Sequence, residues 1–345
     1  MNDDYQHEVL DFRNSVISYG ADLDVDGLVR RIDRGDIFVP AFQRGFVWNI
    51  ELSSRFIESL LLGLPVPAIF LAQEASTRKL LVIDGQQRLF SLFYFYKGKF
   101  LDGKVFALKS VTHPFSGLTY TNLTPEDRRR LDNSIIHAII VRQDDSDESM
   151  GSIYFLFERL NIGGVKLQPQ EIRSALYHGE FNDLLETLNK NEHWRKIYGS
   201  LNERMRDEEL ILRFFGFYFE RDNYQKPLTE FLNRFMARNR DLQIYSKEIL
   251  SKIFLETTKI LSECFGEDVF RPRKTFNVAF TEALMVGIAD RLSHGIINDY
   301  NELKRKYTVL VDNDEFTSLT RVSTTDESRV LHRLTIASQT FSNVA

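Results

Sequence analysis

The stretch Lys79–Leu92, KLLVIDGQQRLFSL, carries the most informative pattern in the chain. It opens with an apolar, β-prone run, turns at an Asp-Gly pair, and continues at once with apolar residues at helical spacing. This pattern predicts a strand, a tight turn and the N-terminus of a helix. The free N–H groups and the positive dipole end of such a helix suit a bound phosphate.

The side chains of this turn fit a phosphate site. Gly85 would let a ligand come close to the backbone. The amides of Gln86 and Gln87 can donate to phosphate oxygens or contact a base. Arg88 can hold a phosphate through two hydrogen bonds, and Asp84 can hold a magnesium-bound water or orient an attacking water.

The same residues allow a structural interpretation. Asp-Gly is a common turn, and Asp84 with Gln87 three residues later has the spacing of a capping box. Arg88 would then be a solvated residue of the first helical turn. An Arg near a helix N-terminus opposes the dipole, however, which favours an anionic partner for it. The turn alone leaves both interpretations open.

A second candidate segment is Phe42–Trp48, FQRGFVW, between a predicted strand and a predicted helix. Gln43 and Arg44 are flanked by aromatic residues and can contact a planar base and its phosphates. The alternative is a hydrophobic staple in which residues 46–48 anchor the next helix and Arg44 lies on the surface.

The third candidate segment runs from Phe157 to Arg173 and contains a predicted helix end and a new helix start near Pro169. Asn161, Lys166 and Arg173 could face the first domain. The alternative is that the segment only separates two helices.

The order of predicted elements divides the chain into two domains. Up to about residue 145 strands and helices mix, and from residue 146 helical periodicity dominates, which predicts an α+β N-terminal domain followed by an all-helical C-terminal domain. The predicted strands are 37–39, 68–72, 79–83, 105–108 and 134–141, and the predicted helices are 25–34, one after the N-cap Asn49, one after the Asp-Gly turn, one from Pro125, 153–160, 171–177, 181–188, 208–219, 228–237, 246–265, 278–292, 298–306 and, after Asp326 as N-cap, 327–341.

Composition and charge exclude several classes of protein. The chain has 345 residues, of which 43% are hydrophobic and 27% charged, as in an ordinary globular protein. Residues 1–150 hold 17 Lys/Arg against 21 Asp/Glu, and the rest hold 27 against 28, so neither half is a basic nucleic-acid-binding domain. DNA contact would need local patches such as Arg128–Arg130 or Arg271–Lys274, although runs of this size are usually solvated faces.

The single cysteine, Cys264, excludes a disulfide framework and a thiolate zinc site within one chain. A reducing compartment, and hence a cytoplasmic location, is the expectation. The most apolar segment, Phe56–Ala72, is interrupted by Glu58 and two prolines, so we expect no membrane span.

Taken together, the segments PAFQRGFVW (40–48), IDGQQR (83–88), and NIGG (161–164) with EIR (171–173) resemble the ParB/sulfiredoxin-like domain at the N-terminus of GmrSD-type modification-dependent restriction enzymes. The resemblance implies a small mixed-sheet domain that binds and hydrolyses a nucleoside triphosphate, with Mg²⁺, in phage defence or restriction. Full-length enzymes of this type carry a His-Asn-His nuclease domain. The four histidines of the C-terminal half here are not clustered, so DNA cutting by this chain alone is not expected.

The resemblance also implies roles for residues of this chain. Asp84 and Arg88 would be catalytic, with Asp84 as a possible Mg²⁺ ligand. The nucleotide would contact Gln43, Arg44, Gly85, Gln86, Gln87 and Ser91, and a second wall would come from Trp48, Asn161, Lys166 and Arg173.

Three functions follow as hypotheses. The first is a nucleotide-binding, NTP-hydrolysing component of a restriction system. The second is a ParB-like protein that binds or nicks DNA. The third is a non-catalytic adaptor for a separate nuclease, and a homo-oligomer is compatible with each of them.

Overall fold

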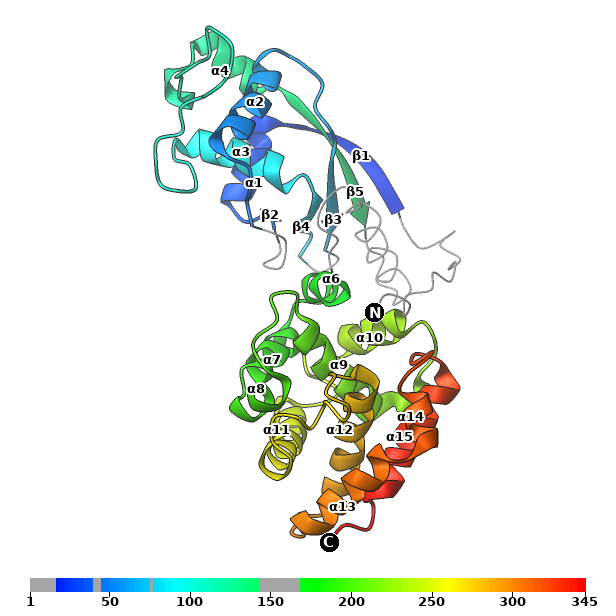
Figure 1. Ribbon diagram of the computed structural model, residues 1–345. Coiled ribbons are helices and arrows are strands. Elements are labelled where there is room, and N and C mark those ends of the chain that lie inside the picture. Colours follow the sequence, from blue (N-terminus) through cyan, green and yellow to red (C-terminus); the bar gives the residue numbers. More distant parts are fainter. Residues whose placement is uncertain (1–16, 40–44, 75–76, 143–167) are drawn as a thin grey trace. The chain divides into compact units, whose positions relative to one another are not determined.

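In the computed structural model, the described residues are 17–39, 45–74, 77–142 and 168–345. They fall into two compact units, residues 17–142 and residues 168–345. The first unit combines a sheet with helices, and the described part of the second contains helices and no strand (Figure 1). The expected α+β class is therefore confirmed, while the predicted boundary after residue 145 lies outside the described residues.

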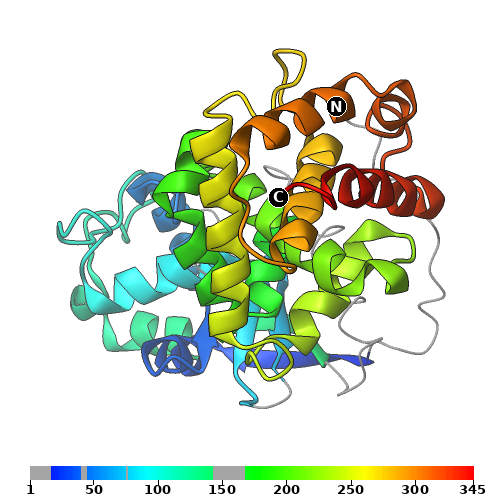
Figure 2. The ribbon, with the colours of Figure 1, turned by 90° about the horizontal axis from the view of Figure 1, so that it is seen from below.

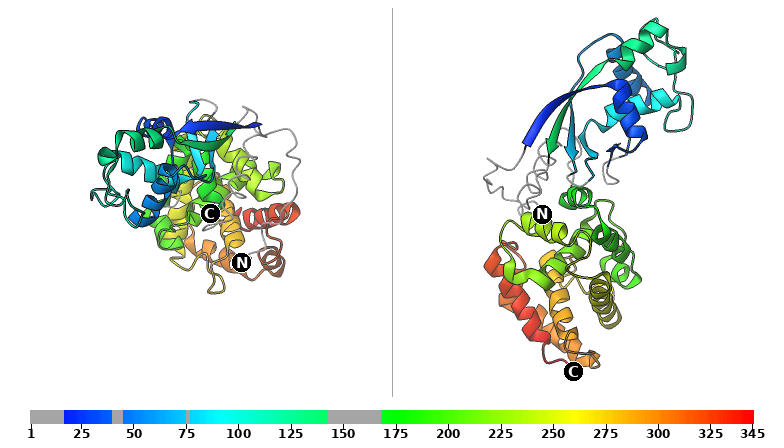
Figure 3. Two further views of the ribbon diagram at one scale, coloured as in Figure 1. Left: turned by 90° about the horizontal axis from the view of Figure 1, so that it is seen from above. Right: turned by 180° about the vertical axis from the view of Figure 1, so that it is seen from behind.

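The first unit is built on a mixed five-stranded sheet. Its strands lie in the order β1 (Ile17–Asp24), β5 (Ile135–Arg142), β3 (Ile69–Gln73), β4 (Leu80–Asp84) and β2 (Ile37–Phe38). The successive pairs are antiparallel, parallel, antiparallel and parallel. The view from behind in Figure 3 shows β1 at the outer edge beside β5.

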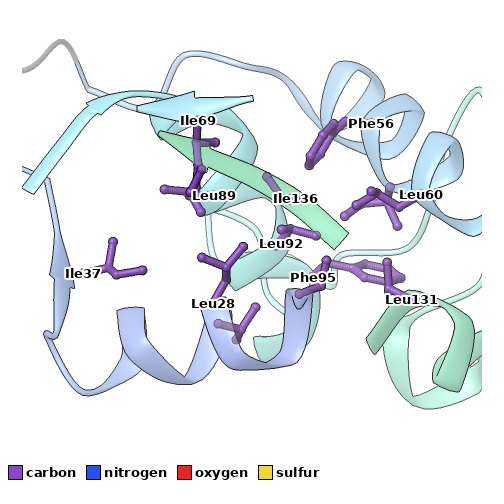
Figure 4. Packing of buried hydrophobic residues seen from close by; sticks show 14 of the residues in the cluster. Leu28, Ile37, Phe56, Leu60, Ile69, Leu89, Leu92, Phe95, Leu131 and Ile136 are labelled. Carbon is purple, nitrogen blue, oxygen red and sulfur yellow. The ribbon is translucent and has the colours of Figure 1, made fainter. Parts of the chain in front are cut away.

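Four helices supply the other half of the first core: α1 (Val25–Asp33), α2 (Ile50–Leu61), α3 (Gln86–Lys97) and α4 (Pro125–Asp132). Leu89, Leu92 and Phe95 of α3 are fully buried against strand residues such as Ile69 and Ile136 (Figure 4). Burial of these large apolar side chains, at about 25 cal/mol per Å² of apolar surface, places the start of α3 firmly against the sheet.

Two predictions for this unit were wrong or incomplete. Strand β1, ISYGADLD, was not predicted, because Gly and Asp are rare in strands and the segment lies at a sheet edge. Residues 105–108 were predicted as a strand, but they form only an isolated bridge from Val105 to Lys99. Phe106 and Leu108 are buried in the core, which explains the alternating apolar pattern without a ladder of hydrogen bonds.

The second unit packs its helices around α12 (Val278–Leu292), whose residues 279–289 are all buried (Figure 2). Gly287 lets α15 approach closely, because a Cβ there would lie 2.9 Å from the backbone of Ala337. The helices of this unit are α6 (Pro169–Leu176), α7 (Glu180–Asn189), α8 (Glu192–Tyr198), α9 (Arg206–Glu220), α10 (Leu228–Arg238), α11 (Lys247–Cys264), α12, α13 (Tyr300–Val311), α14 (Asp314–Leu319) and α15 (Glu327–Phe341).

Most of these helices confirm the predictions made from the helical spacing of apolar residues. The short helices α8 and α14 were not predicted. Asp326 precedes α15 as predicted, but its side chain makes no capping hydrogen bond. The predicted helix 153–160 lies outside the described residues. In the part of the chain that the structure describes, no helix has both the length and the apolar character needed to cross a membrane.

Candidate functional site

The turn after β4 has the predicted strand–turn–helix geometry. β4 ends at Asp84, Gly85 has φ of +102°, and α3 starts at Gln86. A Cβ on Gly85 would lie 2.4 Å from Cγ2 of Ile69 on β3. Glycine is therefore required here by backbone conformation and by close packing on the sheet, rather than by a ligand alone.

The first turn of α3 has no side-chain cap. The N-cap position is Gly85, and among the described residues no side-chain oxygen accepts from the first backbone N–H groups. The capping-box alternative, in which Asp84 and Gln87 cap the helix, is therefore wrong. The positive end of the helix dipole is left available for an anion at this position.

Arg88 forms an ion pair with Asp84, four residues earlier in the sequence. Its Nη2 donates to Oδ2 of Asp84 at 2.6 Å and to the backbone oxygen of Ala68 at 3.2 Å. The Arg88 side chain is only 14% exposed, whereas that of Asp84 is 48% exposed. Arg88 is thus not a solvated surface residue, and the structure brings together the two residues predicted to be catalytic.

Gln87 binds the second candidate segment. Its Oε1 accepts from the backbone N–H groups of Val47 and Trp48 at 2.9 and 3.0 Å, and its Nε2 donates to the oxygen of Gly45 at 3.4 Å. Residues 45–48 of the second candidate segment therefore lie beside the Asp-Gly turn. Gln43 and Arg44, just before Gly45, lie outside the described residues.

Two predicted contact residues have structural partners instead. Ser91 is fully buried, and its hydroxyl donates to the oxygen of Gln87 at 2.7 Å and to Oγ of Ser53 at 3.0 Å. The Trp48 ring packs on Phe56 of α2, with ring centroids 6.0 Å apart. Trp48 thus anchors α2, as the alternative interpretation of this segment expected.

Arg173 belongs to the second unit. It lies on α6, its side chain is 1% exposed, and it donates to Glu209 on α9 at 2.5 Å and to Oε1 of Gln170 at 2.9 Å. Glu209 also pairs with Arg213 at 2.7 Å. The structure therefore places Arg173 in a buried ion-pair network, and the two other residues predicted for the second wall, Asn161 and Lys166, lie outside the described residues.

In the basic cluster Arg128–Arg130, one arginine is engaged inside the first unit. Arg128 donates to the oxygen of Thr121 at 2.7 Å and lies over the Tyr120 ring. Arg130 pairs with Glu126 at 3.6 Å. Arg128 is thus engaged inside the first unit, whereas Arg129 and Arg130 are exposed, so DNA binding by this cluster stays a prediction.

Across residues 17–39, 45–74, 77–142 and 168–345, no group of three or more His, Cys, Asp and Glu side chains could hold a metal ion. Asp84 alone can still supply one oxygen to a Mg²⁺ ion that takes its other ligands from phosphates and water, which is a common way for proteins to bind Mg²⁺.

Comparison with known proteins gives two matches. An aligned stretch of 132 residues is 31% identical to an uncharacterized protein of Methanocaldococcus jannaschii (MJ0686), covering 31% of this chain and only 21% of that protein's length. Residues 25–178 match the family model described as the N-terminal domain of the GmrSD restriction endonuclease, a segment that includes the whole turn and ends two residues after α6. Residues 25–178 therefore belong to the GmrSD N-terminal domain family.

Proposed function

We propose that the Asp84–Arg88 turn binds the phosphates of a nucleoside triphosphate and that the domain hydrolyses it. The observation that carries this proposal is the first turn of α3, which has no side-chain cap among the described residues. It lies beside the half-exposed Asp84 and beside Arg88, whose guanidinium is held by an ion pair with Asp84. The other three α-helices in the described part of this unit begin with a capping side chain, namely Asp24, Asn49 and Thr124. An uncapped N-terminus with a nearby guanidinium favours a bound anion.

Arg88 would stabilise phosphate charge. Asp84 and the Ala68 carbonyl hold its Nη2, so the guanidinium stays at the turn before a ligand arrives. Its Nε is buried and has no hydrogen-bond partner among the described residues. A pre-positioned cation of this kind is effective in phosphoryl transfer because it needs no reorganisation.

Asp84 would hold Mg²⁺ or orient the attacking water. One carboxylate oxygen receives Arg88, and the side chain is 48% exposed, so the other oxygen remains within reach of solvent. Mg²⁺ would neutralise charge on the phosphates when bound. Gln86, at the first position of α3, can add an amide donor, while Gln87 keeps residues 45–48 in place beside the turn.

We propose that this activity serves a restriction system directed against phage or modified DNA, and the match of residues 25–178 to the N-terminal domain of a restriction endonuclease supports this role. A cytoplasmic location is part of the proposal and rests on the single free cysteine, Cys264, which is buried.

The test is NTP hydrolysis by the full chain with Mg²⁺, using ATP, GTP, CTP and UTP. We expect Arg88→Ala and Asp84→Asn each to lower kcat roughly 100-fold or more, the scale typical of a lost charge-stabilising group. Arg30→Ala is the matched control, because Asp26 and Arg30 form an exposed pair with the same i,i+4 spacing on α1. Hydrolysis that is equal in wild type, both turn variants and the control would contradict the catalytic role.

A further inference from the structure

The second unit contains a pocket that the proposed function does not use. It has a volume of about 130 Å³ and lies between the loop preceding α12 and helix α14. Its apolar lining includes Phe276, Phe280 and Phe316, and the rings of the last two meet edge to face at 5.8 Å. Arg273 and Arg321 also line it, and both are exposed.

The pocket walls are held by hydrogen bonds. Arg271 donates to the backbone oxygens of Ile197, Tyr198 and Glu267 at 2.8–3.1 Å, which fixes the loop. Nδ2 of Asn277, at the end of this loop, donates to the oxygen of Thr320 at 3.1 Å and so ties the loop to the segment after α14. Because these hydrogen bonds already order the pocket walls, binding of a ligand would cost little conformational entropy.

The size of the pocket limits its occupant. Pockets for whole cofactors or drug-sized ligands measure roughly 300–1,000 Å³. A pocket of about 130 Å³ accepts a group the size of one side chain. Small, pre-formed pockets that are lined in part by aromatic rings are typical receptors for a single anchor residue at a protein–protein interface.

The charges near the pocket favour a short acidic peptide over a nucleic-acid strand. Arg273 and Arg321 can pair with one or two carboxylates beside the anchor. Asp312, Asp314 and Glu315 lie in the same chain segment as the pocket residues Val311 and Phe316, so positive charge at the pocket is confined to the two arginines. Such a small positive area matches one or two carboxylates better than a continuous phosphate backbone.

We propose that this pocket docks a partner protein by receiving one apolar side chain flanked by acidic residues, with Arg273 and Arg321 pairing to those residues. The basic cluster Arg271–Lys274 is then divided by role. Arg271 holds the pocket wall, and Arg273 contacts the partner. Val322, 67% exposed and next to Arg321, extends the apolar surface outside the pocket.

The test uses fluorescein-labelled peptides and the full chain in an anisotropy titration. The probe is Gly-Asp-Asp-Phe-Asp-Asp-Gly, compared with versions in which Ala replaces Phe or Lys replaces Asp, and with a labelled single-stranded oligonucleotide. We expect the acidic Phe peptide to bind best. Arg273→Glu and Arg321→Glu should each weaken it about tenfold, the effect of losing a charge-assisted hydrogen bond.

Arg234→Glu, a half-exposed position on α10, is the control for a change of charge alone and should leave peptide binding unchanged. Unaltered melting of all three variants shows that they remain folded. Equal affinities for the Phe and Ala peptides would contradict the proposal that the pocket receives an apolar side chain. Preferential binding of the oligonucleotide, lost in Arg273→Glu and Arg321→Glu, overturns the protein partner in favour of nucleic acid.

Discussion

Oε1 of Gln87 accepts the backbone N–H of Trp48 at 3.0 Å, joining the first turn of α3 to the segment that precedes α2. The same oxygen accepts from Val47, so one side chain replaces a backbone partner for two consecutive N–H groups. Sequence reasoning assigned Gln87 to a ligand. Its observed role is to keep two candidate segments together, and this role can be tested separately from nucleotide binding.

Gln87→Leu should release residues 45–48 while preserving the volume of the side chain. Two N–H groups would lose their acceptor, which costs roughly 1–3 kcal/mol each where they are shielded from water. We expect hydrogen exchange at the amides of Val47 and Trp48 to accelerate at least tenfold. Gln86→Leu is the adjacent control and should leave these amides protected. Unchanged protection in Gln87→Leu would show that the segment is held by other contacts.

Gly85→Ala should be far more damaging than Gly98→Ala at the other end of the same helix. Both glycines have positive φ, +102° and +70°, so both variants carry backbone strain of about 1–2 kcal/mol. Only at Gly85 would the new Cβ meet Ile69, whereas no atom lies within 4 Å of the corresponding position at Gly98. We expect an additional loss of about 1–3 kcal/mol for Gly85→Ala, measured by urea unfolding. Equal losses would mean that the sheet yields to the new methyl group.

The strand–turn–helix at residues 80–97 could be predicted because its signal is local. An apolar run, an Asp-Gly pair and helical spacing follow one another without interruption. β1 could not be predicted, since its pairing with β5 joins residues more than a hundred positions apart and its own sequence contains Gly and Asp. Residues 105–108, by contrast, were predicted as a strand but do not form one. Alternate residues of this segment are buried in the core, and such a burial pattern does not require hydrogen bonds to a neighbouring strand.

The candidate site was predicted in part for the same reason. The sequence indicated an anionic partner for Arg88 from its place near a helix N-terminus. The structure identifies Asp84, at the end of β4, as one such partner. The hydrogen bond between Trp48 and Gln87 joins residues that are 39 positions apart in the sequence, so no local pattern indicates it. Likewise, the charge of Arg173 suggested a ligand, and only the packing of α6 on α9 shows its buried partner, Glu209.

Arg173→Ala should destabilise the second unit. The substitution leaves Glu209 with Arg213 as its remaining ion-pair partner and creates a void at a side chain that is 1% exposed. Removing one partner of a buried ion pair costs roughly 3–5 kcal/mol, and the cost here should fall at the lower end because Arg213 stays. Lys190→Ala, in the exposed Glu186–Lys190 pair, is the control and should change stability by less than about 1 kcal/mol. If Arg173→Ala instead has normal stability but binds nucleotide more weakly, Arg173 contacts the ligand as the sequence predicted.

Glu208 should make the second unit less stable as the pH rises from about 4.5 to about 7. Burial, together with the negative charges of Asp207 and Glu186, raises the pKa of Glu208 to about 7 from its ordinary value of 4.5. The folded state therefore binds this proton more tightly than the unfolded state does. The contribution of Glu208 to the free energy of unfolding is full below about pH 4.5, falls between pH 4.5 and 7, and is constant above that.

Glu208→Gln keeps the shape of the side chain and removes its charge, so the variant should lack this pH dependence. We expect it to be more stable than wild type by about 1–3 kcal/mol at pH 8, with the difference shrinking toward pH 5, in urea unfolding at matched ionic strength. Glu256→Gln, at an exposed position on α11, is the control for a lost surface charge. A stability difference that stays constant from pH 5 to pH 8 would show that Glu208 does not titrate in this range, because only a group whose protonation changes there can give the variant and wild type different slopes.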